Sequence, residues 1–95
     1  MPTWARARTI IGEPNVSADI ESFRQQLPRF DEAYEALKWN LARRAESLGL
    51  RSHWKKTEYR LYRQDRDPIA MTPSLIVVYT YSIDQVIIVG LQAAI

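Results

Sequence analysis

The chain has 95 residues, a formal net charge of +2 at pH 7 and no cysteine. This length suits one domain with a single core, so we expect residues 1–95 to form one unit. Without cysteine, a disulfide framework and a thiolate metal site or nucleophile are excluded. No apolar run approaches the roughly 18 residues of a membrane span, and the N-terminus lacks the apolar segment of a signal peptide, so we expect a cytoplasmic protein.

The positive charge is concentrated in one segment. Residues 1–50 carry seven basic and seven acidic side chains, and residues 67–95 carry two acidic and no basic ones. Residues 51–66 carry six basic and two acidic side chains, a local net charge of +4, interleaved with Trp54, Tyr59 and Tyr62. The positive charge is therefore local, in the segment just before the predicted hairpin.

The first elements predicted are a strand and a short helix. Residues 4–11 end in a β-branched run before the turn signal Gly-Glu-Pro-Asn at residues 12–15, which predicts a strand followed by a turn. Ser17 is a suitable N-cap for a helix that ends near Gln26, because two acidic residues in the first turn complement the helix dipole.

A second helix is predicted over residues 28–48, with Pro28 at its first position and Gly49 just after its end. Apolar residues recur in it at steps of three and four, which predicts a stripe that faces the core. The stripe comprises Phe30, Tyr34, Leu37, Leu41, Ala45 and Leu48.

The second half of the chain predicts strands. Residues 58–64 alternate in character, and we expect Tyr59 and Leu61 to face the core while Arg60 and Tyr62 share the opposite face. Residues 74–91 contain two apolar, β-branched runs separated by a short polar turn at residues 82–85. These runs predict an antiparallel hairpin at the centre of a sheet.

Together the elements predict an α+β fold in the order β-α-α-β-β-β. A small antiparallel sheet of about four strands should carry the helical hairpin on one face. The helical stripe should then pack against inward-facing hairpin residues, either Leu75, Val77, Val86 and Ile88 or their neighbours of opposite parity.

Few residues predict chemistry. His53 is the only histidine and has no partners at ligand spacing, the three glycines are scattered, and Asp65 and Asp67 suit a turn better than a carboxylate pair. We therefore expect no metal and no cofactor. The basic segment with its aromatic residues suits single-stranded RNA, because cations neutralise phosphates and aromatic rings stack on bases. A solvated edge strand explains the same composition, and the sequence leaves both interpretations open.

The segments FDEAYEALKWNLARRAESL at residues 30–48, EYRLYRQ at 58–64 and LIVVYTYSIDQVIIVGL at 75–91 resemble the RelE/ParE superfamily of toxins from bacterial type II toxin-antitoxin modules. The resemblance covers nearly the whole chain as a pattern of elements and apolar positions. It implies a cytoplasmic toxin neutralised by a cognate antitoxin. RelE-like members cut mRNA on the ribosome without metal, whereas ParE-like members act on DNA gyrase.

The resemblance also implies site residues. Two alternating lysines of the RelE pattern fall on Arg60 and Tyr62, the candidate catalytic residues, while an arginine of the next strand falls on Ile76 and a basic residue after the last strand falls near Gln92 or Ala93. Metal-free cleavage needs a base, an acid and cations for the phosphoryl charge. Tyr62, Tyr79 or Tyr81 could supply a proton. The candidate RNA-binding residues are Lys55, Lys56, Arg63 and Trp54.

The departures from the family pattern leave the activity open. The resemblance implies a toxin that binds RNA, either as an mRNA interferase or with an active site too incomplete to cleave. A toxin that acts on gyrase and a non-catalytic interaction domain are the alternatives.

Overall fold

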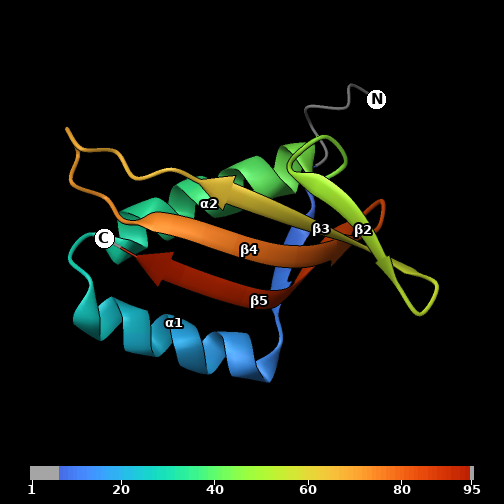
Figure 1. The fold of residues 1–95 in the computed structure, drawn as a ribbon, viewed down its shortest axis with the longest axis horizontal. Helices are drawn as coiled ribbons and strands as arrows, with labels where there is room; N and C mark the ends of the chain where they lie inside the picture. The colour runs from blue at the N-terminus through green and yellow to red at the C-terminus, as the bar shows by residue number, and fades with distance from the viewer. Residues whose placement is uncertain (1–6, 95) are drawn as a thin grey trace.

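The computed structural model describes residues 7–94, which form an α+β fold with two helices and a five-stranded sheet (Figure 1). The elements are β1 (Thr9–Gly12), α1 (Pro14–Gln26), α2 (Phe30–Arg44), β2 (Leu50–Trp54), β3 (Thr57–Gln64), β4 (Ser74–Tyr81) and β5 (Gln85–Ala94). The predicted fold class is confirmed, with one strand more than expected.

The strands lie in the order β1-β5-β4-β3-β2 across the sheet. Strands β2 to β5 pair antiparallel in succession, whereas β1 runs parallel to β5, so the sheet is mixed rather than wholly antiparallel as predicted. The predicted hairpin of β4 and β5 occupies the interior. Opposite Val78 and Tyr79 the register shifts and leaves Val89 without a direct partner, which allows both Ile88 and Leu91 to face inward.

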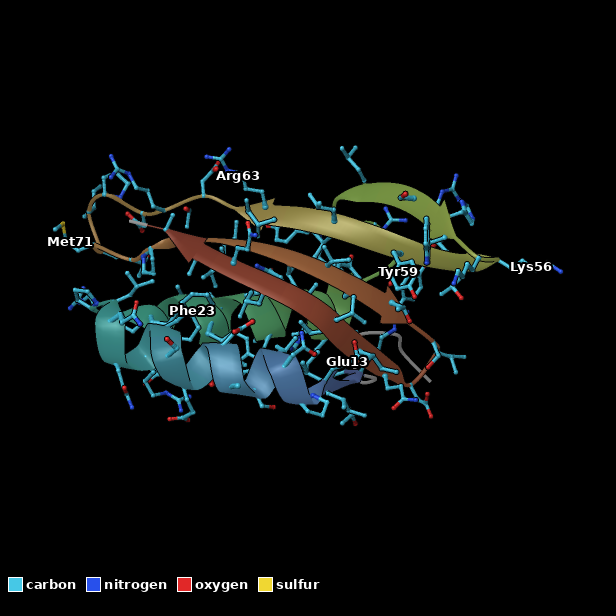
Figure 2. The ribbon with its side chains drawn as sticks, turned by 60° about the horizontal axis from the view of Figure 1, so that its bottom comes forward. Glu13, Phe23, Lys56, Tyr59, Arg63 and Met71 are labelled. Carbon is cyan, nitrogen blue, oxygen red and sulfur yellow. The ribbon has the colours of Figure 1, made fainter. Side chains whose placement is uncertain are left out.

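Both helices cover the same face of the sheet (Figure 2). All six stripe residues of the predicted second helix are buried, each at most 8% exposed. They pack in one cluster with Leu75, Val77, Val86 and Ile88 of the hairpin, so the predicted packing is confirmed. From α1, Val16 is buried and Phe23 packs between the helix and the sheet (Figure 2).

The predicted helix starts are wrong. Helix α1 begins at Pro14, inside the segment predicted as a turn, and Glu13 rather than Ser17 is its N-cap. Proline suits this first position because its fixed φ matches the helix and its missing N–H would have no partner there. Helix α2 begins at Phe30 rather than Pro28, after Arg29 in a left-handed conformation with φ of 61°.

The end of α2 also differs from the prediction. The α-helix stops at Arg44, whose carbonyl oxygen still accepts hydrogen bonds from the N–H groups of Ser47 and Leu48. Gly49 follows with φ of 72°, and a side chain there would collide with the backbone of Leu61. Glycine is therefore needed both for its backbone conformation and for this close approach.

Strand β2 was not predicted, because LRSHW has no β-branched residue and its two apolar residues, Leu50 and Trp54, are separated by three polar ones. It forms through a two-residue turn in which Lys55 and Lys56 both have positive φ, 49° and 68°, the pattern of a type I′ hairpin. Strand β1 is shorter than predicted, and residues 4–6 of the expected strand lie outside the described residues.

The predicted orientation of β3 is wrong. Arg60 pairs with buried Tyr79 and Tyr62 pairs with buried Val77, so both face the helices. Leu61 lies on the other side and is 46% exposed. The prediction placed arginine in water, whereas its long side chain here passes through the edge of the core to reach polar backbone groups.

Candidate functional surface

No described helix covers the second face of the sheet, which we call the open face (Figure 2). Alternation along the paired strands places apolar and aromatic side chains from all five strands on it. Exposed members are Ile11, Leu50, Trp54 and Leu61, and partly buried members are Tyr59, Ile76, Val78, Ile87 and Val89. A contiguous apolar surface of this kind is typical of an interaction site.

The open face is hollowed at its centre. A cavity of about 510 Å³ lies there, within the range of known ligand and side-chain pockets. Its wall includes Trp54 and Tyr59, and its other lining residues are Glu13, Ser52, Arg60, Leu61, Val78 and Val89. The hollow can therefore receive an apolar or aromatic group from a partner.

The four predicted RNA-binding residues lie on or beside the open face. Trp54 is 65% exposed, and Lys55 and Lys56 form the turn next to it, with the Lys55 ammonium 5.7 Å from the centre of the Trp54 ring. Arg63 points away from the helices (Figure 2) and forms an exposed ion pair with Asp65 at 3.0 Å. Such a pair is weak, so the guanidinium can change partner at little cost.

Arg60 lies on the opposite face. Its Nε donates a hydrogen bond to the Leu48 carbonyl oxygen at 2.7 Å and its Nη2 donates to that of Gly49 at 3.4 Å. Its side chain is only 11% exposed. Arg60 therefore satisfies carbonyl groups beyond the end of α2 with its guanidinium, although the residue also contributes with Trp54 to the wall of the hollow. Tyr62 packs against the core.

The positions implied by the family resemblance, namely Arg60, Tyr62, Ile76 and Gln92, fall on two faces of the sheet. Arg63, Ile76 and Gln92 are consecutive partners across β3, β4 and β5, so they form one row on the open face. Arg60 and Tyr62 face the helices and cannot join this row. Arg63 is the one cation in this row, whereas the family resemblance implies basic residues at the positions of Ile76 and Gln92 as well.

A polar cluster that the sequence did not predict surrounds Glu58 on the helix side. Its carboxylate accepts a hydrogen bond from the Tyr81 hydroxyl at 3.4 Å and lies 3.8–3.9 Å from His53, Arg51 and Arg60. Only the pairing of β2 with β3 brings His53 opposite Glu58, so missing β2 meant missing the cluster. At 3.9 Å, Arg51 and Arg60 are too far from the Glu58 carboxylate for hydrogen bonds, and they offset its negative charge.

Tyr79 was one of three expected proton donors, but it is fully buried. Burial raises the pKa of Tyr79 to about 12, against the opposing effect of Arg60. Its hydroxyl donates to the carbonyl oxygen of Ala45 at 2.7 Å, and the carbonyl oxygen of Leu48 lies 3.2 Å from the same hydroxyl. The phenol is therefore a structural group that no substrate reaches.

Asp67 accepts hydrogen bonds from the backbone N–H groups of Ile69 and Ala70, the turn chemistry expected of it. Within residues 7–94, no three histidine, aspartate or glutamate side chains are grouped to hold a metal ion, and no helix is both long and apolar enough to span a membrane.

Compared with known proteins, the chain matches no family model, no curated protein and no solved structure.

Proposed function

We propose that this chain is the RelE/ParE-like toxin component of a type II toxin-antitoxin module, that it binds RNA through the open face, and that a cognate antitoxin inhibits it by covering that face. The observation that carries the proposal is the uncovered apolar centre of the sheet with cations at its margin. The order of elements and the helical layer on one side agree with what the resemblance implies.

The apolar centre supports a protein partner. Ile11, Leu50 and Leu61 are apolar, yet more than 40% of each residue is exposed to solvent in the single chain. An antitoxin segment that covers them would remove this surface from water, which is the main favourable term in protein association. The same observation supports the second candidate, a toxin that acts on a protein target such as DNA gyrase.

The margin supports RNA as the target. Trp54 presents an exposed ring on which an unpaired base can stack. Lys55 and Lys56 follow it in the turn, where they can contact the phosphates next to that base. Arg63 adds a cation on the same face. The row with Ile76 and Gln92 lacks further cations, so the proposal is RNA binding, with any cleavage limited by that deficit.

The test is binding of a single-stranded RNA oligomer over a series of salt concentrations. Affinity should fall with salt, and replacing both Lys55 and Lys56 with serine should flatten the log–log slope by about 0.7 for each phosphate that is no longer neutralised. Lys38→Ser is the matched control, because Lys38 lies on α2 and pairs with Glu35. An affinity independent of salt, or an equally flattened slope in the control, would refute RNA binding at this surface.

The partner has its own test. Co-expression with the product of an adjacent short reading frame should give a stable complex in which amides of β3 to β5 exchange hydrogen more slowly than in the free chain. Replacing Leu61 with lysine should weaken that complex, since it places a charge on the apolar centre. Protection confined to the helices would place the partner elsewhere.

A further inference from the structure

Strand β2 forms one edge of the sheet, and all five of its residues are exposed. A free edge offers unpaired N–H and C=O groups to another strand, and natural proteins protect it with a short strand, charged side chains, proline, a bulge or a cover. Strand β2 is five residues long and carries one permanent charge, on Arg51. Leu50–Trp54 contains no proline and pairs with β3 without a register shift. Among the described residues, no backbone hydrogen bond outside the sheet engages Arg51 or His53.

The register shows which groups face outward. Trp54 and Thr57 close a two-residue turn, and such a pair exchanges hydrogen bonds across the ladder. Because bonded and non-bonded pairs alternate along an antiparallel ladder, Ser52 also points its backbone groups toward β3. The N–H and C=O groups of Arg51 and His53 therefore point to the free edge.

We propose that β2 pairs with β2 of a second copy of this chain, antiparallel and with Ser52 opposite Ser52. In this register Arg51 of each copy exchanges two hydrogen bonds with His53 of the other, four bonds in all. A register centred on Arg51 would place two guanidinium groups directly opposite each other, and one centred on His53 would oppose Arg51 and Lys55. Like charges directly opposite destabilise a pair, so charge selects the Ser52 register.

The same register matches apolar side chains. Leu50 of each copy lies opposite Trp54 of the other, in non-hydrogen-bonded pairs where side chains approach most closely. Leu50 is 75% exposed and Trp54 is 65% exposed in the single chain, and both lie on the open face. Pairing thus covers two apolar residues per copy that β2 otherwise leaves in water.

The pairing joins two five-stranded sheets into one. The two-fold axis stands perpendicular to the sheet, so both pairs of helices lie on one side and both open faces on the other. Two five-residue strands bury less than a standard interface, so the dimer should be reversible and depend on concentration. The pairing places Leu50 of the other copy beside Trp54, so it alters the surface proposed for RNA. The inference itself rests on the edge and register of β2, and it stands whether or not the chain binds RNA.

Sedimentation velocity of the purified chain tests the pairing. As concentration rises from micromolar to sub-millimolar, the mass should approach twice the 11.1 kDa of one chain. His53→Pro removes an edge-facing N–H and should raise the dissociation constant about tenfold or more, and Leu50→Lys should do the same by removing an apolar pair. Circular dichroism establishes that each variant is folded.

Trp39→Lys is the matched control, because Trp39 is 57% exposed but lies on α2. The control should dimerise like the parent chain. A parent that remains monomeric throughout the concentration range would overturn the inference. So would a dimer that survives both β2 substitutions, or one that only Trp39→Lys dissociates.

Discussion

The phenol of Tyr79 on β4 donates a hydrogen bond to the carbonyl oxygen of Ala45, at 2.7 Å, and so ties the centre of the sheet to the end of α2. The helix ends in the core here rather than in water, so its last carbonyl groups need protein donors. Tyr79 supplies one of these donors and Arg60 supplies another, to Leu48. This junction of Tyr79 and Arg60 with the carbonyl groups of Ala45 and Leu48 anchors the end of the helical layer to the sheet.

Tyr79→Phe should therefore lower the free energy of unfolding by about 1–2 kcal/mol, since it leaves the Ala45 carbonyl without its donor. Urea unfolding at pH 8 measures the change. Tyr59→Phe is the control, because Tyr59 lies at the open face and lines the cavity. Equal destabilisation of the two variants would contradict this role of the junction.

Stability should also fall in alkali because of Tyr79. Its pKa is raised to about 12 by burial, whereas an unfolded tyrosine ionises near about 10. The contribution of the neutral phenol is thus fully present below about pH 10 and is lost as pH rises through about 12. Unfolding measured across this window should decline less steeply in Tyr79→Phe than in the parent; identical slopes would assign the decline to other groups.

Arg60→Ala should destabilise the fold by about 1–3 kcal/mol, because it removes a charged donor from the carbonyl groups of Leu48 and Gly49. Arg63→Ala, three residues along the same strand but 68% exposed, should stay within about 0.5 kcal/mol. Thermal and urea unfolding of the two variants make the comparison. If the two changes prove equally mild, Arg60 is not a structural group.

Gly49→Ala should cost about 3 kcal/mol or more, or prevent folding, because a side chain at φ of 72° would collide with the backbone of Leu61. Gly90→Ala is a matched control. The nearest atom to an added Cβ there is Val78 Cβ, at 3.9 Å, so the change should be neutral or slightly stabilising. Soluble yield and unfolding midpoint report both outcomes, and a well-folded Gly49→Ala chain would contradict this geometry.

A substitution in the turn between β2 and β3 should change the stability of the fold and its affinity for RNA in opposite directions. Lys55 and Lys56 adopt left-handed conformations that Asn and Gly adopt at lower cost, so the double change to Asn-Gly should stabilise the fold by about 1–2 kcal/mol. The same change should weaken RNA binding, because it removes two cations. Unfolding and RNA titration together decide; a variant that gains stability and keeps its RNA affinity would show that the lysines have no part in binding.

The elements that periodicity specifies were predicted correctly. The α2 stripe and the β4–β5 hairpin repeat apolar residues at helical and strand spacing, and both proved to be core. The start of α1 was missed because a proline signal was assigned to a turn, although Pro14 suits a first helical position equally well.

The site was harder to predict than the core, because it depends on pairing between distant segments. The alternation in β3 fits either orientation, and only its register with β4 decides that Arg60 faces the helices. Strand β2 has only two apolar residues, Leu50 and Trp54, and forms by pairing with β3. The basic segment is exposed around Trp54, but its residues are divided between two faces, and this division depends on the pairing of the sheet.

Induced expression in bacteria tests the central claim most directly. We predict that the parent chain arrests growth and that a Trp54→Ala, Lys55→Ser, Lys56→Ser triple variant, expressed to the same level and folded, does not. Arg44→Ser, which removes an exposed cation on α2, should remain as toxic as the parent. Normal growth with the parent chain, or arrest by the triple variant, would contradict a toxin that acts through the open face.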